Sequence, residues 1–420
     1  MMKKTVTALV LIVALVLGMG IVGYGFELKT LKQIPGNIHI GNLKIHPYIS
    51  SSVSYTDNIF TEPDSEKGST IYKIKPGILF QLPFMTHFIQ IDYHANIERA
   101  ERFHKAYDTE DHYLSSVINL NFNRLNILVT DNWQRAANLP DYQGDIRDQY
   151  YYNQVRTEIS YKLTGRYKVT AFYMNEFKNY GNYKARPTAY DPELDNYWKN
   201  EYGFDFYYRI FPLTSILLEY AYTDINNKDE NLPDTDSENH RVWFGVKWEP
   251  TAKITGIIKG GWTKREYDGP GDDWDGFGLK ANLTYNYSSF TKFSIQSFRE
   301  PVDTTVTTAV LLPSGLRVQG DYGTYYISSG VTFTIEQKCP RIPGLSAKAY
   351  FSYTNDDYQE KGQFTEERDD DRFQYGVNIS YKATRWIKAS IGYHYLTNES
   401  NFDSEDYREN MFTASLTLTF

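Results

Sequence analysis

Histidine, acidic and cysteine side chains are the groups in this sequence best suited to chemistry, and their spacing argues against a catalytic or metal centre. The eight histidines are scattered along the chain: His39, His46, His87, His94, His104, His112, His240 and His394. No His-Glu-x-x-His, Gly-x-Ser-x-Gly, P-loop or Gly-x-Gly-x-x-Gly pattern occurs. Cys339 is the only cysteine, which excludes an intrachain disulfide and a multi-cysteine metal site. We therefore predict no catalytic residue, no metal and no cofactor.

Two histidines and two acidic runs leave alternatives open. His94 and His394 fall on the polar face of their predicted strands, where each could serve a hydrolase, although a polar wall residue is the favoured interpretation. The runs "DPELDN" and "ERDDDR" could bind calcium. They lack the ligand spacing of a calcium loop, so solvated loops are the favoured interpretation.

A strict two-residue alternation runs through the rest of the chain. The last residues, "MFTASLTLTF", place Phe412, Ala414, Leu416, Leu418 and Phe420 on one face and small polar residues on the other. "HFIQIDYHANIE", "RFQYGVNISYK" and "WIKASIGYHYL" repeat the pattern. Successive side chains of a β-strand point to opposite faces, so this period predicts strands throughout.

The breaks between these strands alternate between short turns such as "LTGRY" and long acidic loops such as "NNKDENLPDTDSEN". About eighteen strands of about ten residues or more result, long enough to cross a bilayer when tilted. Propellers and solenoids repeat at a similar scale but lack this alternation. Tyrosine is abundant (37 of 420 residues) and aromatics gather near strand ends. We predict an all-β fold, a transmembrane antiparallel β-barrel with short periplasmic turns and long extracellular loops, in the bacterial outer membrane of a Gram-negative cell.

The chain divides into three predicted parts. Residues 1–25 carry two lysines, an apolar run and small residues, the layout of a secretory signal peptide; an uncleaved membrane anchor is the alternative. Residues 26–42 form a short periplasmic N-terminal segment, too short for a plug domain. Residues 43–420 form the barrel.

The polar face of the strands is basic although the net charge of the chain is −8. Basic residues outnumber acids such as Asp92, Glu219 and Glu336 by roughly two to one on this face. A positive lumen favours anions or an acidic polymer, whereas generic ion pairing across the wall is the alternative. The sequence contains no basic cluster with interleaved aromatic residues of the kind that binds nucleic acid, so no nucleic-acid partner is predicted. The predicted pore-lining basic residues are Lys73, Lys75, Arg156, Lys199, Arg209, Arg241, Lys259, Lys280, Lys348 and Arg372.

Aromatic residues on the same face could stack on sugars or simply fill space. They are Tyr48, Tyr152, Tyr207, Trp243, Tyr326 and Tyr350. About sixteen to eighteen strands enclose an aqueous channel. The least polar long loop, residues 302–322, is predicted to fold inward and narrow the pore; an extended hairpin above the membrane is the alternative.

The stretch "VSYTDNIF", with Tyr55 to Phe60 following "HPYIS", resembles the start of the putative beta-barrel porin type 2 family. These are outer-membrane barrels often encoded with exopolysaccharide synthesis genes. The resemblance implies a passive conduit that exports extracellular or capsular polysaccharide; the alternative is a general or anion-selective uptake porin. The aromatic Phe420 resembles the mark by which outer-membrane barrels are recognised for insertion. Expected partners are outer-membrane lipid and lipopolysaccharide, with polysaccharide and periplasmic export components also implied.

Overall fold

The computed structural model describes residues 38–420 except 139–146, 181–195, 228–235, 249–252, 270–272, 304–308, 312–316, 320–324 and 363. Nearly all of the described chain is β-strand. Eighteen long antiparallel strands, each paired with its neighbour in sequence, form one sheet. The first of them, β2, pairs on its other edge with the last, β21, so the sheet closes on itself. The predicted fold class, a transmembrane β-barrel of about eighteen strands, is confirmed.

The barrel strands are between 12 residues (β11) and 16 residues (β3) long. Their bounds are β2 Leu43–Thr56, β3 Ser69–Phe84, β4 His87–Ala100, β5 Thr109–Asn121, β6 Leu125–Ala137, β7 Gln149–Lys162, β8 Tyr167–Asn179, β9 Tyr197–Phe211, β10 Thr214–Asn227, β11 Ser237–Trp248, β12 Ile254–Tyr267, β13 Trp274–Asn286, β14 Thr291–Asp303, β17 Tyr325–Lys338, β18 Leu345–Tyr358, β19 Asp369–Lys382, β20 Ile387–Ser400 and β21 Tyr407–Thr419. About nine to eleven residues suffice to cross a bilayer, so these strands extend beyond it.

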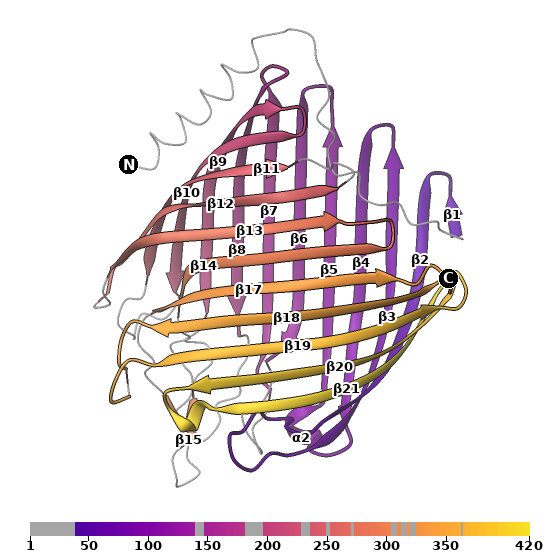
Figure 1. Ribbon diagram of the computed structural model, residues 1–420, viewed down its shortest axis with the longest axis vertical. Helices are drawn as coiled ribbons and strands as arrows, with labels where there is room; N and C mark the ends of the chain where they lie inside the picture. Colours follow the sequence, from indigo (N-terminus) through magenta and orange to yellow (C-terminus); the bar gives the residue numbers. More distant parts are fainter. Residues whose placement is uncertain are drawn as a thin grey trace.

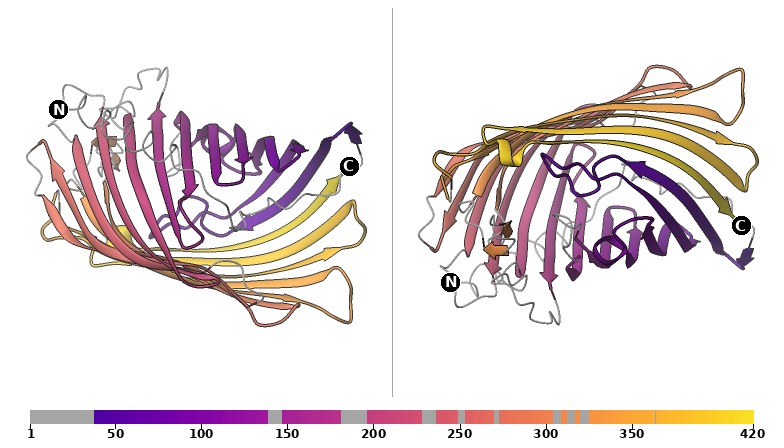
Figure 2. Two further views of the ribbon diagram at one scale, coloured as in Figure 1. Left: turned by 90° about the horizontal axis from the view of Figure 1, so that it is seen from above. Right: turned by 90° about the horizontal axis from the view of Figure 1, so that it is seen from below.

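The walls of the barrel are strongly tilted against each other. In Figure 1 the indigo-to-magenta strands from β2 to β8 run along the long axis, and the orange and yellow strands from β13 to β21 run across them. The views along the barrel in Figure 2 show a flattened cross-section in which the two walls lie one over the other. A tilt between strands and barrel axis is a geometric requirement of closing a sheet.

One face of each strand is apolar and exposed, as the alternation in the sequence predicts. On β2 it presents Ile49, Val53 and Tyr55, and on β21 it presents Phe412 and Leu416; each is between 39% and 56% exposed. Lipid, not water, is the environment in which such a continuous apolar band is favourable. We call this the outer face and the opposite face, which looks into the barrel, the inner face.

The seam between β2 and β21 is held by small polar side chains of the inner face. Ser50 hydrogen-bonds Thr417 and Ser54 hydrogen-bonds Thr413, each at 2.9 Å, and Ser52 lies directly opposite Ser415. Closure leaves no strand edge with unpaired backbone groups, which lipid could not satisfy.

The stretch that carries the family resemblance fastens this seam at the long-loop rim. Asn58 is fully buried; its amide nitrogen donates to the backbone oxygens of Glu62 (2.8 Å) and Arg408 (3.0 Å), and its side-chain oxygen accepts from the Glu62 amide (3.1 Å). Asp57 accepts from the Asn410 amide at 2.7 Å. The "DNIF" segment therefore ties the first long loop to the last strand.

A small apolar core covers the seam on the same rim. Phe60, 1% exposed, packs with Ile59 and Ala100 and with Ala106 and Tyr107 of the short helix α2 (His104–Tyr107). Burial raises the pKa of Tyr107 to about 12, so its phenol is uncharged at physiological pH. Long loops are thus partly folded structures of their own; the loop before β21 also holds the 3₁₀ helix η2, Asp403–Glu405.

The N-terminal segment and the seventh long loop are only partly described. β1, Ile38–Ile40, forms a hairpin with the start of β2, and β2 begins at Leu43. The predicted signal peptide, residues 1–25, lies outside the described residues. In the 302–322 loop, β15 (Ala309–Leu311) pairs with β16 (Arg317–Gln319) as a separate two-stranded sheet. The rest of that loop lies outside the described residues, and its inward folding stays a prediction.

Candidate functional site

All ten predicted basic residues lie on the inner face, because each alternates with exposed apolar residues of its own strand. Lys73, for example, falls between Tyr72 and Ile74, which are 48% and 46% exposed. Ion pairs with acids of the same face involve Lys73, Arg156, Arg241, Lys259 and Arg372. Lys75, Lys199 and Arg209 are half-buried on this face, and Lys280 and Lys348 are exposed. Whether these side chains line a conducting pore remains a proposal.

An ion-pair network, here called the charge ladder, crosses the inner face from β7 to β12. Arg156 contacts Glu158 at 2.8 Å and Glu201 at 3.2 Å. Arg241 contacts Glu201 at 3.5 Å and Glu219 at 2.8 Å. The ladder ends at Lys259, which forms an ion pair with Glu219. Its three cations face three acids, so the ladder adds no net charge to the wall and its pattern matches the ion-pairing alternative.

The ladder is built on aromatic side chains that the sequence predicts to line the lumen. Trp243 is 3% exposed and Tyr207 is 6% exposed. Trp243 donates from its ring nitrogen to Thr263 at 2.9 Å, and Lys168 and Lys247 lie over the Tyr207 ring at 3.9 and 5.1 Å. For these two residues the space-filling alternative is favoured, because the neighbouring cations and strands cover their rings.

Glycines on neighbouring or next-but-one strands make room for aromatic rings of the inner face. A Cβ atom on Gly278 would lie 2.6 Å from Cζ2 of Trp243, and one on Gly77 would lie 2.2 Å from Cζ of Tyr48. Contacts that short do not occur, so each ring lies flat on the wall only because its neighbour lacks a side chain. Tyr350 lies on Gly376 in the same way, with a Cβ–Cε1 distance of 2.6 Å.

The remaining predicted aromatics are half-buried and bonded to the wall. Tyr48 donates to Asp92 at 3.0 Å, Tyr350 hydrogen-bonds His394, and Tyr326 stacks on Tyr358 with ring centroids 4.9 Å apart. Tyr152 is half-buried on β7. Their partly exposed rings are the aromatic surface that the inner face offers, and His394 serves as a wall residue hydrogen-bonded to a tyrosine.

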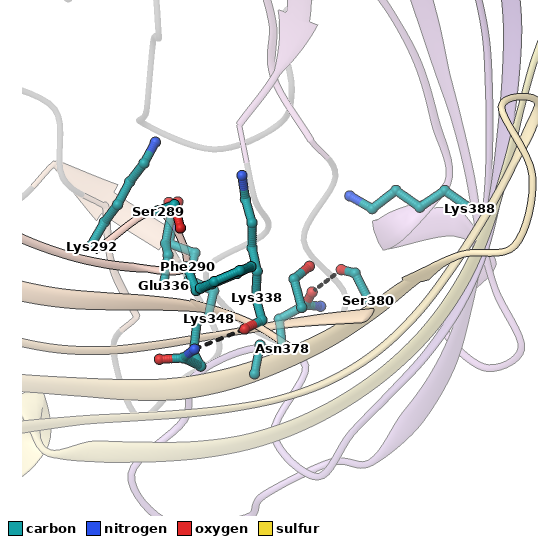
Figure 3. A pocket seen from close by; sticks show the side chains of 12 residues that line it. Ser289, Phe290, Lys292, Glu336, Lys338, Lys348, Asn378, Ser380 and Lys388 are labelled. Atoms are coloured by element: carbon teal, nitrogen blue, oxygen red, sulfur yellow. Dashed lines mark hydrogen bonds between the residues drawn. The ribbon is translucent and has the colours of Figure 1, made fainter. Parts of the chain in front are cut away.

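A second site, not anticipated as a unit from the sequence, lies at the short-turn end of β14 to β20. We call it the lysine cluster: Lys292, Lys338, Lys348 and Lys388 line one hollow together with Glu336. Figure 3 shows Lys292, Lys338 and Lys388 extending away from the wall on the same side. Lys348 is one of the predicted pore-lining residues. The alternation of Lys292 with Phe293, which is 40% exposed, is the signal that places Lys292 on the same face.

The described residues contain no group of three or more His, Cys, Asp or Glu side chains suited to a metal ion. Cys339 is a free thiol, half-buried beyond the end of β17. In the described part of the chain no helix has the length and apolar character needed to span a membrane.

A closed barrel of eighteen strands with an apolar outer face and a polar, charged inner face defines an outer-membrane β-barrel porin. Residues 221–420 match the family model described as "Putative beta-barrel porin 2". The match confirms the resemblance to this family over residues 221–420, a range that does not include "VSYTDNIF". The bacterial outer membrane is confirmed as the location. The barrel fold and the matched family model both point to a channel.

Comparison with solved structures finds likenesses in overall fold. OpdL of Pseudomonas aeruginosa is 15% identical with a TM-score of 0.45, covering 91% of this chain and 100% of its own. OccAB3 of Acinetobacter baumannii is 10% identical with a TM-score of 0.47, with the same coverage of both chains. Likenesses this distant say nothing about the solute that passes through this barrel. A search of curated proteins returns no match.

Proposed function

We propose that this protein is a passive, anion-preferring diffusion porin for small hydrophilic solutes, and that it has no enzymatic role. The observation that carries the proposal is the distribution of charge on the inner face. The charge ladder is neutral, whereas Lys280 and the lysine cluster have no ion-pair partner among the described residues. The charge that these groups leave without an ion-pair partner is therefore positive, which attracts anions.

Export of an extracellular polysaccharide, which the family resemblance implies, is the second candidate. The tyrosines at the inner surface, Tyr48, Tyr152, Tyr326 and Tyr350, favour it because aromatic rings can stack on sugars. Against it, Tyr207 and Trp243 are covered, and the tyrosines that are partly exposed are bonded to the wall. We therefore favour diffusion of small solutes. Polysaccharide and periplasmic export components as partners belong to this second candidate alone.

Liposome swelling with purified protein tests the proposal. Vesicles diluted into isosmotic solutions should swell faster in a small anionic solute than in a neutral solute of the same size, and slowest in a cationic one. Equal swelling rates in the anionic, neutral and cationic solutes would contradict the proposed preference for anions. For the second candidate, deletion of the gene should abolish secreted polysaccharide and leave polymer in the periplasm; unchanged polymer would exclude it.

The outer face is proposed to contact lipid and lipopolysaccharide directly. Its aromatic residues gather near both rims, as with Tyr381 and Phe290 beside short turns and Trp262 and Tyr55 near long loops, each between 42% and 51% exposed. Amphipathic rings are favourable at the two membrane–water interfaces.

A further inference from the structure

We propose that the lysine cluster is a binding site for small anions that carry more than one negative charge, located at the short-turn, periplasmic mouth of the barrel. The inference rests on the proposed function, because a solute must enter the barrel to reach the site. It adds to that function a place and a ligand class.

The cluster is defined by four strands that present lysine at the same level. Lys292 is the second residue of β14 and Lys338 is the last residue of β17. Lys348 is near the start of β18 and Lys388 is near the start of β20. All four border one hollow of about 260 Å³. In Figure 3 the side chains of Lys292 and Lys338 extend upward from the wall, and the side chain of Lys388 extends toward them from the right. Four lysines from four strands therefore border one hollow that could hold a small ligand.

The cluster holds four lysines and one acid, so its charge is positive. Lys292 and Lys348 both lie opposite Glu336 in the strand register, so one carboxylate stands between two lysines. Lys388 lies opposite Lys382, another cation. None of these residues forms an ion pair with a described residue. Like charges on directly opposed positions of neighbouring strands destabilise a sheet, and a bound anion would remove that repulsion.

The charge ladder of the same sheet provides a comparison, because its cations are paired with acids of the wall itself. Every cation of the charge ladder has an acid within 3.5 Å or closer, and its acids Glu201 and Glu219 have side chains only 11% and 4% exposed. The lysines of the cluster are exposed and lack such partners. The lysine cluster is open to solvent, whereas the charge ladder is neutralised within the wall. This difference points to an anion from solution as the partner of the lysines.

Neutral hydrogen-bonding groups complete the lining of the hollow. Ser289, Ser346, Asn378 and Ser380 border it, and Ser380 donates to the Asn378 side-chain oxygen at 2.9 Å. Lysine ammonium groups are compact point charges with three donors and do not select a planar ligand. The site is therefore expected to respond to the number of negative charges, and to accept phosphate as well as small di- and tricarboxylates.

Single-channel recording in a planar bilayer tests the site with two probes, inorganic phosphate and citrate, added to one side at a time in a potassium chloride background. The test variant carries Lys292→Gln, Lys338→Gln, Lys348→Gln and Lys388→Gln. The control is Arg341→Gln, which removes an exposed positive charge from the turn between β17 and β18, at the same rim. Shifted mobility of unheated samples on gels confirms that each barrel is folded.

We expect both probes to reduce the chloride current of the wild type, citrate at lower concentration than phosphate and more strongly from one side. In the fourfold variant the concentration for half-block should rise by roughly tenfold or more, because the local enrichment of counter-ions is lost. The Arg341→Gln control should keep the wild-type value. Block by phosphate without block by citrate would assign phosphoryl ligands; the reverse would assign carboxylates.

Two results would overturn the site while leaving the porin intact: conducting channels with no block by either probe, or equal block in the wild type and the fourfold variant. Block only by an oligomer of uronic acids would also overturn it, in favour of an acidic polymer. Absence of any conductance from folded protein would instead contradict the proposed function itself, so the two failures are distinguishable.

Discussion

Neutralising Glu219 tests whether the charge ladder is a structural element of the wall. The Glu219 carboxylate is 4% exposed and accepts from Arg241 at 2.8 Å while forming an ion pair with Lys259. Glu219→Gln keeps one acceptor for Arg241 but leaves Lys259 without its described acid. The matched control is Glu336→Gln, which removes the same charge from an exposed position on the same face.

The magnitude follows from burial. A pair of charges about 4 Å apart attracts by about 4 kcal/mol at an effective dielectric constant of about 20. Part of this offsets the desolvation of the three groups, and breaking one side of a fully buried pair costs about 3–5 kcal/mol. Because Arg241 and Lys259 keep 17% and 16% of their side chains exposed, water can partly replace the lost carboxylate. We expect a loss of about 2 kcal/mol for Glu219→Gln and less than about 0.5 kcal/mol for Glu336→Gln.

Urea titration of vesicle-reconstituted protein measures this difference, with the folded fraction read from the mobility of unheated samples. With an m-value of roughly 3 to 4 kcal/mol/M, the midpoint of Glu219→Gln should fall by about 0.5 M, and that of Glu336→Gln should stay near the wild type. Both variants should raise anion preference, since each removes one negative charge. Equal midpoints for the two variants would refute the ladder as a stabilising network.

Three further changes test the fold that positions the inner face. Gly278→Val should lower the free energy of unfolding by about 1–3 kcal/mol, because its side chain displaces the Trp243 ring; the quenching and wavelength of tryptophan fluorescence should change with it. Cysteines at Ser52 and Ser415, in a Cys339→Ser background, should form a disulfide on mild oxidation, because the two residues face each other across the closing seam. Asn58→Ala should cost about 2–3 kcal/mol by leaving buried backbone groups unpaired, and should speed proteolysis of the first long loop.

Each of these has a matched comparison. Gly165→Val, at a glycine with open space around its built Cβ, should leave unfolding unchanged, and a loss equal to that of Gly278→Val would contradict the ring-on-glycine packing. Cysteines at Ser52 and Ser390 should not cross-link, because β21 lies between their strands. Proteolysis of the Asn58→Ala loop at the wild-type rate would mean that the seam does not depend on this side chain.

The sequence predicts the barrel well because strand alternation is a local property. A side chain such as Lys348 or Arg241 can be assigned to the inner face from its neighbours alone, and the start of the barrel at residue 43 coincides with the first residue of β2. Strand number follows from counting breaks, and closure follows from the requirement that no strand edge meets lipid.

Contacts between strands could not be predicted in the same way. Register sets Arg241 diagonally across from Glu219, where the two form an ion pair, and sets Lys348 directly opposite Glu336, where they do not. Register depends on turns and bulges that a single sequence does not specify. To predict the burial of Trp243, one would have to recognise Gly278 as its neighbour. Gly278 is more than thirty residues away in sequence and lies two strands further along the sheet. Counting inner-face charges therefore gives the sign of the wall but not which charges remain free.

The central claim, an open pore that prefers anions, is tested most directly by its reversal potential. Purified protein is placed in a neutral planar bilayer with a roughly tenfold gradient of potassium chloride. The reversal potential of the single-channel current should have the same sign as the chloride equilibrium potential. Lowering the ionic strength should increase the preference, because less salt screens the fixed charges of the wall. A reversal potential with the sign of the potassium equilibrium potential, or folded protein that carries no current, would contradict the account.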